Sequence, residues 1–243
     1  MLKITSLRDM ISQWNQLGKS SFGIPSLDRV TGGLRRGYLY SIFGDSGVGK
    51  TWFCLQIIKE LWTQNSDAQV LYSDFSGHLR GGNVKKIIQK PQHLEQISIV
   101  KPESLVEQVI FFRKFLYESR NSKYDLVVLD TLVGSPLDAA YFMGREKEKW
   151  ITLLADHLLD LKILASQLQV PIIFTNHLLI QSSDQNLSHS HFGEQYAQGV
   201  ISEFTCMNCH IVKDNGSFEV FFSRFGEHPF TSKWNLAALT DMQ

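Results

Sequence analysis

The chain has 243 residues, 43% of them hydrophobic, and its 24 basic and 24 acidic side chains give a formal net charge of +0 at pH 7. This length suits one large α/β domain better than two small ones, and the balanced charge excludes a global attraction to nucleic acid or membranes. Three cysteines are too few for a disulfide framework. With no apolar run near the ~20 residues that span a bilayer and no secretory leader, we expect no membrane contact and a cytoplasmic protein, nuclear in a eukaryotic cell.

Residues 1–20 form a short lead-in, with apolar residues at helical spacing over Ser6 to Leu17, and residues 21–243 are expected to form the core domain. A turn-rich approach then leads to an apolar strand over Tyr38 to Phe43. A helix is expected from Thr51 to Ile58. The stretch between this strand and this helix decides the chemistry.

That stretch fits G-x-x-x-x-G-K-[ST] at every fixed position. Its residues are Gly44, Asp45, Ser46, Gly47, Val48, Gly49, Lys50 and Thr51. Backbone N–H groups of such a turn face an anion, and the helix N-terminus adds partial positive charge. Lys50 is placed to reach the outer phosphates of ATP and the Thr51 hydroxyl to reach Mg²⁺. The stretch predicts a phosphate-binding loop; the alternative is an ordinary glycine-rich turn.

The middle of the chain continues to alternate strands and helices. Strands are predicted at Gln69 to Asp74 and Ile97 to Val100, and helices at Asn83 to Lys90 and Ser104 to Ser119. Tyr124 to Leu132 contains four consecutive apolar residues, typical of a buried parallel strand, followed by Asp130. A carboxylate at the end of such a strand lies beside the phosphate loop and can hold Mg²⁺ through water. The alternative is a strand-end aspartate that caps the next turn.

The last hundred residues add one more helix and strand, and then strands alone. We predict a loop at Gly134 to Glu148, a helix at Lys149 to Leu168, a strand at Val170 to Asn176, an irregular polar segment at Leu178 to Gly199, and hairpin strands at Val200 to Val212, Ser217 to Phe225 and Thr231 to Leu239. The order predicts an α/β fold: a mostly parallel twisted sheet flanked by helices, with a C-terminal antiparallel hairpin extension.

Six short segments carry a family resemblance: Gly23 to Asp28, Gly44 to Thr51, Asp74 to Gly77, Leu129 to Thr131, Tyr141 to Glu146 and Thr175 to His177. In this order they resemble the ATPase core of RecA/RadA-type recombinases, especially the archaeal and eukaryotic branch and its short RadA paralogues such as RadB. The resemblance implies a RecA-like P-loop NTPase core that binds ATP and Mg²⁺ and acts in recombinational DNA repair. KaiC-like regulatory ATPases or kinases, which do not act on DNA, share the layout and are the alternative.

Departures from the family pattern limit what the resemblance implies. Ser76 stands where the family has its catalytic glutamate, and losing a positioned base costs about 10²- to 10⁴-fold in rate. We therefore expect weak ATP hydrolysis unless Asp74 or a partner subunit orients the water. His177 replaces the family's sensor glutamine and changes charge near pH 6.5 as a free side chain. The alternative for His177 is a strand-end histidine with no sensing role. The candidate catalytic residues are Lys50, Asp74 and His177.

We expect this chain to bind mainly protein partners. The lead-in has no Phe-x-x-Ala self-assembly motif, so we expect an accessory subunit that joins a RadA-type recombinase or other RecA-family subunits in a homo- or hetero-oligomer. Arg145, Lys147 and Lys149 can contact phosphates, but Leu178 to Gly199 has no lysine or arginine, so single-stranded DNA binding should be weak. A structural subunit with a silent nucleotide site is the third hypothesis.

Overall fold

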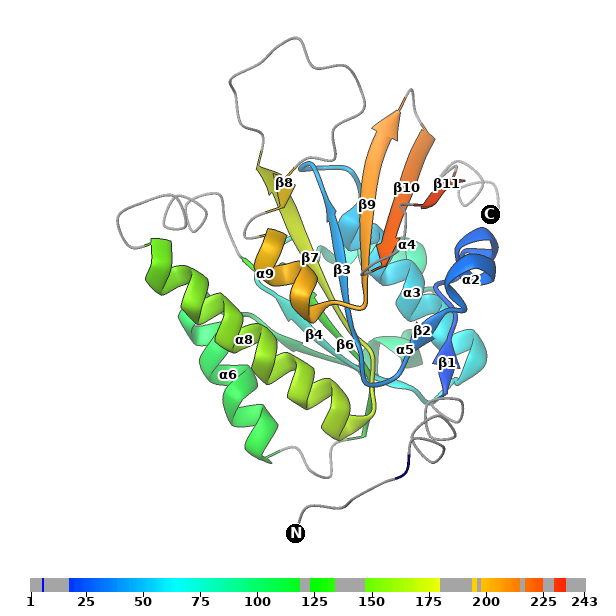
Figure 1. Cartoon of the computed structure of the whole chain (residues 1–243). Coiled ribbons are helices and arrows are strands. Elements are labelled where there is room, and N and C mark those ends of the chain that lie inside the picture. Colours follow the sequence, from blue (N-terminus) through cyan, green and yellow to red (C-terminus); the bar gives the residue numbers. More distant parts are fainter. Residues whose placement is uncertain are drawn as a thin grey trace.

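A single large sheet organises the fold in the computed structural model, which describes residue 6 and residues 18–118, 123–133, 147–179, 194–195, 198–214, 217–224 and 230–234. The parallel strands are β3 (Leu39–Gly44), β4 (Gln69–Asp74), β5 (Ile97–Val100), β6 (Tyr124–Asp130), β7 (Ile172–Leu179) and β9 (Met207–Asp214). They lie in the order β9-β3-β7-β6-β4-β5. Strands β10 (Ser217–Arg224) and β11 (Phe230–Trp234) extend this order antiparallel beyond β9 (Figure 1). The predicted α/β class and hairpin extension are confirmed.

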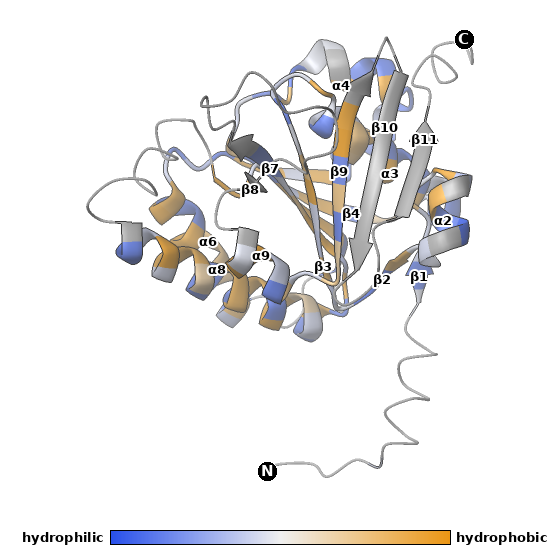
Figure 2. Ribbon diagram, turned by 45° about the horizontal axis from the view of Figure 1, so that its top comes forward, coloured by the Kyte–Doolittle hydropathy of each residue, from blue (hydrophilic) through white to orange (hydrophobic). Residues whose placement is uncertain are grey.

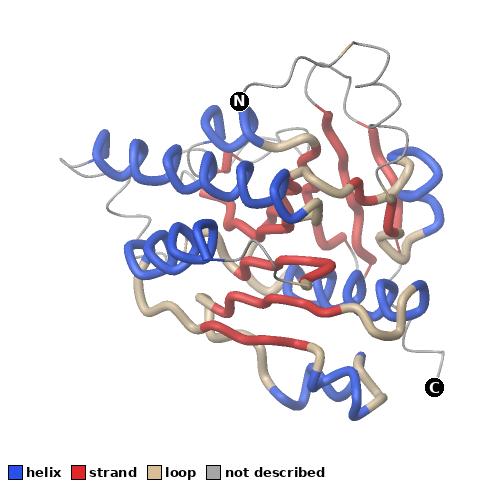
Figure 3. The backbone as a smooth tube through the Cα atoms, turned by 90° about the horizontal axis from the view of Figure 1, so that it is seen from below, coloured by secondary structure: helices blue, strands red, loops and turns tan. Residues whose placement is uncertain are grey.

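Helices cover both faces of the sheet (Figures 1 and 3). On one face lie α2 (Pro25–Thr31), α3 (Lys50–Gln64) and α4 (Gly81–Ile87), with the short α5 (Pro91–Glu95) beside α3. On the other lie α6 (Leu105–Glu118), α8 (Lys147–Leu168) and α9 (Gln198–Phe204). Strands β1 (Lys19–Ser20) and β2 (Leu34–Arg35) form a separate two-stranded sheet. No helix in the described part of the chain is both long enough and apolar enough to cross a bilayer.

The central strand β6 shows why its sequence is apolar without alternation. Leu126 and Val128 pack into the core beneath α3, whereas Val127 and Leu129 pack into the core beneath α6 and α8. Because successive side chains of a strand point to opposite faces, a strand covered on both faces needs apolar residues at every position. Figure 2 shows this continuous hydrophobic interior between the two helical layers.

Three short elements differ from the sequence expectation. The prediction of a strand from Val200 is wrong, because α9 occupies this region and the strand begins only at Met207. Helix α5, begun by Pro91, was not expected because it is only five residues long. In the polar segment, β7 continues to Leu179 and pairs with β8 (Glu194–Gln195), so the described ends of that segment are regular. The lead-in helix and the loop at 134–146 lie outside the described residues, apart from Ser6.

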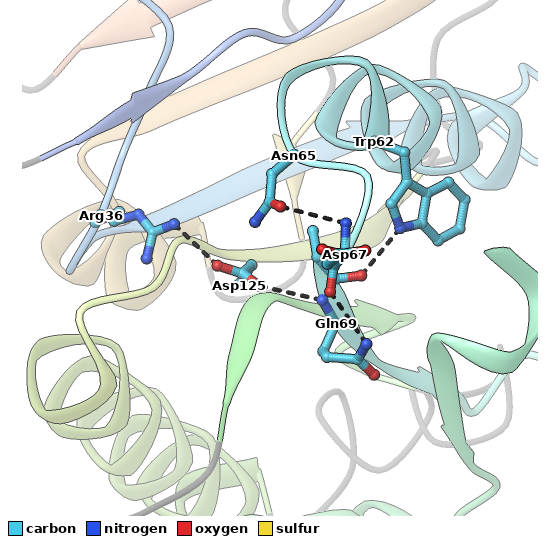
Figure 4. A network of polar contacts seen from close by, with 7 residues as sticks. Arg36, Trp62, Asn65, Asp67, Gln69 and Asp125 are labelled. Carbon is cyan, nitrogen blue, oxygen red and sulfur yellow. Dashed lines mark hydrogen bonds and ion pairs between the residues drawn. The ribbon is translucent and has the colours of Figure 1, made fainter. Parts of the chain in front are cut away.

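A polar network connects residues at the amino-terminal ends of the parallel strands (Figure 4). The sequence motifs lie at the opposite, carboxyl ends of these strands. Arg36 forms an ion pair of 3.0 Å with Asp125 at the start of β6, and Asp125 accepts the backbone N–H of Gln69 at 3.1 Å. The indole of Trp62 donates to the carbonyl of Ala68 at 3.0 Å. These bonds connect the starts of β4 and β6 to the end of α3. They therefore help to hold these three elements in their relative positions.

Candidate nucleotide site

The phosphate loop joins β3 directly to α3. At its start, a Cβ atom on Gly44 would lie 2.5 Å from the carbonyl oxygen of Ile211, so the loop can approach β9 only with glycine there. At its end, Gly49 has φ +96°, a left-handed conformation that other residues adopt at a cost, and α3 begins at Lys50. The sequence prediction of a strand, a glycine-rich turn and a helix is confirmed.

The Lys50 ammonium group lies folded back over this loop. Its Nζ atom donates to the carbonyl oxygens of Gly44 and Asp45, both at 2.8 Å. Burial lowers the pKa of Lys50 to about 8, while the nearby carboxylates of Asp130 and Asp45 oppose that shift. A cation held by two neutral carbonyls can exchange them for phosphate oxygens, which would compensate its charge better.

Asp130 lies at the centre of a cluster of hydroxyl groups at the end of β6. Its Oδ2 atom accepts hydrogen bonds from Thr51 at 2.6 Å and Tyr72 at 2.8 Å. Its Oδ1 atom accepts one from Thr175 at 2.6 Å. Burial and the charge of Asp130 raise the pKa of Tyr72 well above its usual value, which keeps that hydroxyl a donor. The cluster fixes one carboxylate between α3, β4 and β7.

His177 lies near the carboxyl end of β7, two residues before Leu179, and beside Lys50. Its Nδ1 atom is 3.5 Å from the Lys50 Nζ atom. Burial, and then the charge of Lys50, lower the pKa of His177 to about 4, so the imidazole is neutral at pH 7 rather than titrating near pH 6.5. Its backbone N–H donates to the side chain of Asn176 at 3.0 Å. A neutral imidazole can donate to or accept from a ligand that contacts Lys50.

These groups share one pocket of about 390 Å³, within the usual range for small-molecule sites. Twelve described residues line it: Ser46, Gly47, Gly49, Lys50, Thr51, Trp52, Leu55, Ser76, His78, Arg80, Asp130 and His177. Sequence reasoning did not single out Trp52, Leu55, His78 or Arg80. Trp52 and Leu55 could have been predicted to line the site, because they lie in the first turns of the helix that begins within the motif.

Ser76, at the position of the family's catalytic glutamate, and Asp74, the candidate for orienting water, lie differently relative to the pocket. Ser76 lines the pocket, and its backbone N–H donates to the carbonyl of Asp130 at 3.0 Å. Asp74 is 3% exposed, and its Oδ1 atom is 3.4 Å from the backbone nitrogen of Leu79. Asp74 is not among the described residues that line the pocket. Of these two residues, the one that lines the pocket therefore carries a hydroxyl rather than a carboxylate.

A buried amide lies behind these strand ends. Gln108 of α6 is fully buried; it accepts the hydroxyl of Ser73 at 3.0 Å and donates to the carbonyl of Leu132 at 2.9 Å. Ser73 precedes Asp74, and Leu132 follows Asp130 by two residues. One side chain of α6 thus holds the ends of β4 and β6.

Of the three basic residues expected to contact DNA, the structure describes the side chain of Lys149 alone. Arg145 lies outside the described residues, and the side chain of Lys147 is not described although its backbone begins α8. Lys149 is exposed in the first turn of α8. Their contact with DNA stays a prediction.

Comparison with known proteins identifies the family that this chain resembles. The family model described as Rad51 matches residues 15–216, which include every element from the phosphate loop to β9. The chain belongs to the Rad51 family. It is a RecA/Rad51-type recombinase paralogue with a RecA-like core, in a family of recombination and repair proteins that bind ATP.

Among curated relatives of this Rad51-family chain are two proteins named DNA repair protein RAD51 homolog 4. The one from Bos taurus is 26% identical over 173 residues, which cover 65% of this chain and 52% of that protein. The one from Mus musculus is 27% identical over 179 residues, which cover 65% of this chain and 51% of that protein. The matched part therefore spans about half the length of these relatives.

Proposed function

We propose that this Rad51-family chain binds ATP with Mg²⁺ and assists a full recombinase in recombinational DNA repair, with hydrolysis that is weak or depends on a partner subunit. The observation that carries the proposal is the composition of one pocket: Lys50, Thr51 and Asp130 line it together with Ser76. The groups that hold a nucleotide are present, whereas the position expected for the hydrolytic carboxylate carries a serine. Nucleotide then acts more as a conformational ligand than as a fuel.

The oxygen atoms beside the phosphate loop fit a magnesium ion. Thr51 and Asp130 supply a hydroxyl and a carboxylate whose oxygens lie 2.6 Å apart, and Mg²⁺ prefers such hard oxygen ligands. Thr51 would bind the ion directly and Asp130 through water, while Tyr72 and Thr175 keep the carboxylate oriented. The bound ion would neutralise charge on the phosphate oxygens.

The remaining side chains favour holding ATP over cleaving it. The hydroxyl of Ser76 cannot act as a carboxylate base, and Asp74 is buried with its Oδ1 atom turned toward the backbone nitrogen of Leu79. The neutral imidazole of His177, next to Lys50, is suited to hydrogen-bond the outermost phosphate. A partner subunit that supplies the missing base would then control hydrolysis.

We place the recombinase or other RecA-family partner at the β5 edge of the sheet. Strand β5 ends the strand order, and an edge strand can pair with a strand from another chain. On the neighbouring helix α6, Val106, Ile110 and Tyr117 are 45%, 60% and 74% exposed. Apolar side chains exposed in this number beside a sheet edge are typical of a protein-binding surface. Single-stranded DNA would bind weakly, through Lys149 and its neighbours.

Turnover measurements test this proposal. The purified chain should bind Mg·ATP and hydrolyse it slowly, with little change on adding single-stranded DNA, and hydrolysis should rise when a RecA-family partner is added. Rapid DNA-stimulated hydrolysis together with strand exchange by this chain alone would contradict the accessory role. Failure of Lys50→Ala to alter nucleotide binding or partner capture would instead favour a structural subunit with a silent site.

A further inference from the structure

We propose that Arg35, together with Lys19, binds a phosphate group at a second site, in a pocket at the amino-terminal ends of β3 and β9. The pocket has a volume of about 160 Å³, and Arg35, Tyr38 and Tyr40 are among its lining residues. It shares no lining residue with the nucleotide pocket. None of the described residues that line it carries a carboxylate.

A glycine turn before β2 holds β1 beside this pocket. Gly32 and Gly33 have φ values of +73° and +81°, left-handed conformations that favour glycine. A Cβ atom on Gly33 would lie 2.5 Å from the carbonyl oxygen of Ser20, so β1 can approach the turn only with glycine there. A Cβ atom on Gly32 would lie 3.5 Å from the Nζ atom of Lys19. The Lys19 ammonium group therefore lies next to a turn whose Gly33 lines the pocket.

Lys19 and Arg35 are directly opposite each other in the antiparallel pair of β1 and β2. Side chains at such positions share one face of the pair, with Cβ atoms about 4.5–5.5 Å apart, and like charges there are destabilising. Neither cation forms an ion pair with a carboxylate in the part of the chain that the structure describes. An anion bound between them would replace this repulsion with attraction.

The Arg35 guanidinium is half-buried without a compensating charge. Its Nε atom is buried and has no hydrogen-bond partner among the described residues. The adjacent phenol of Tyr40 accepts the backbone N–H of Arg35 at 2.6 Å. Burial, and then the nearby Cys206 thiol, raise the pKa of Tyr40 well above its usual value, so this phenol stays neutral. Removing part of a charge from water without a counter-ion is costly, and a ligand anion would offset that cost.

Two carboxylates of this region are engaged elsewhere. Asp125 pairs with Arg36, the residue that follows Arg35, at 3.0 Å (Figure 4). Asp28 of α2 accepts hydrogen bonds from Ser21–Phe22, one at each carboxylate oxygen, at 2.6 Å and 2.7 Å. The fold therefore compensates the charge of Arg36 but leaves that of Arg35 for a ligand.

A phosphate group fits the charge and the size of this pocket. Two cations can balance the nearly two negative charges that a phosphate monoester carries at pH 7, whereas a carboxylate carries only one. The planar guanidinium of Arg35 can bind two phosphate oxygens at once. The Tyr38 phenol, which also lines the pocket, can donate a further hydrogen bond. The volume lies below the roughly 300–1,000 Å³ usual for small-molecule sites, so the pocket would take a phosphate group and not a whole nucleotide.

The experiment is a titration of isotope-labelled protein with inorganic phosphate at constant ionic strength, followed by the amide NMR signals. The signals of Gly32 and Gly33 report on the turn beside this pocket, and those of Gly47 and Gly49 report on the phosphate loop. Phosphate should shift the signals of Gly32 and Gly33. Added Mg·ATP should displace phosphate from the phosphate loop and leave it bound beside Gly32 and Gly33.

Three variants test the side chains. Arg35→Gln should weaken phosphate binding beside the glycine turn by about tenfold or more, because a charged hydrogen bond is lost. Lys19→Gln, a change at an exposed side chain, should also weaken it, and it decides if Arg35→Gln does not fold. The matched control is Arg29→Gln, since Arg29 is an exposed arginine of α2 that is not among the lining residues. It should bind phosphate as the wild type does.

Unshifted Gly32 and Gly33 signals in the wild type, or equal losses in Arg35→Gln and Arg29→Gln, would overturn the site. Tighter binding of acetate than of phosphate would overturn the ligand class. Tighter binding of O-phosphoserine than of inorganic phosphate would assign the pocket to a phosphorylated side chain, and the reverse order would assign it to the free ion. If Mg·ATP leaves the signals of Gly47 and Gly49 unchanged, the proposed nucleotide function fails while this site stands.

Discussion

The hydroxyl of Thr51 donates a 2.6 Å hydrogen bond to the Oδ2 atom of Asp130, which joins the first turn of α3 to the end of β6. Thr51 and Asp130 are 79 residues apart in the chain, yet both line the pocket that holds Lys50. The proposed magnesium ion would bind at this pair of oxygens.

Asp130→Asn should lower the Mg²⁺-dependent part of ATP affinity by roughly 10- to 100-fold, the usual effect of altering a group that orients or holds a metal. The amide keeps the shape and one acceptor but loses the charge. Titration of ATP at several Mg²⁺ concentrations measures the effect. Asp67→Asn, an exposed carboxylate at the opposite edge of the sheet, should bind as the wild type does. Equal Mg²⁺ dependence in both variants would remove Asp130 from the metal site.

Lys50→Ala should weaken ATP binding by roughly 10- to 100-fold, because a charged hydrogen bond contributes about 1.5–3 kcal/mol. The control is Lys59→Ala, since Lys59 lies on the same helix but is exposed and does not line the pocket. Calorimetric titration with Mg·ATP compares the two. Indistinguishable affinities would mean that the phosphate loop does not bind nucleotide.

Ser76→Glu should increase ATP hydrolysis, because it places a carboxylate at a pocket position that now has only a hydroxyl. The gain can reach up to about 10²-fold, the lower end of what a positioned base contributes. Phosphate release at saturating Mg·ATP is the measurement. Ser76→Gln has nearly the same size without a basic group and should stay at the wild-type rate. A similar rate in the two variants would show that the missing base does not limit hydrolysis.

Ile110→Glu should reduce capture of a RecA-family partner and leave ATP affinity unchanged, because Ile110 is 60% exposed on α6 and is not among the described residues that line the pocket. Pull-down with and without a non-hydrolysable ATP analogue measures it. Ile163→Glu makes the same change at an exposed apolar residue of α8 and serves as the control. Partner capture that falls only in the α8 variant would move the interface to that helix.

His157→Leu should make the protein more stable and less sensitive to acid. His157 is fully buried, neither ring nitrogen has a partner among the described residues, and burial followed by the charge of Arg113 lowers its pKa to about 3. Above pH 6.5 the folded and unfolded states both hold a neutral ring. Below it, only the unfolded state gains the proton, so stability falls by about 1.4 kcal/mol per pH unit until the folded pKa is reached.

Denaturant unfolding at pH 7 and pH 5 tests that outcome. The wild type should lose about 2 kcal/mol more than His157→Leu between these two values. His78→Leu, a change at an exposed histidine, should leave the wild-type acid sensitivity intact. A parallel decline in wild type and His157→Leu would assign the acid sensitivity to other groups.

Patterns with a fixed local cause could be predicted from the sequence. The phosphate loop needs its glycines where the backbone turns left-handed or meets β9, and β6 needs apolar residues on both faces, so both patterns are visible in the residues themselves. The pattern around Val200 led to a wrong prediction. Val200, Ile201 and Phe204 have helical spacing, but two β-branched residues and an aromatic one also favour a strand. Only packing against α8 decides for the helix.

The pocket itself could be predicted only in part. Lys50, Thr51 and Asp130 follow from motifs, whereas Arg80 and His78 belong to a segment with no motif and enter the pocket because β4 lies beside β6 in the sheet. Strand order is a long-range property that no local pattern contains. The neutral state of His177 is likewise a result of burial beside Lys50, which the residue type alone does not show.

The buried amide of Gln108 gives helix α6 a second role. The outer face of this helix carries Ile110, and its inner face holds Ser73 and Leu132 through two hydrogen bonds. Leaving one such buried polar group unpaired costs about 1–3 kcal/mol. A movement of α6 along its axis would therefore have to move the ends of β4 and β6 with it, so this helix connects the protein's outer surface mechanically to the strand ends of the candidate nucleotide site.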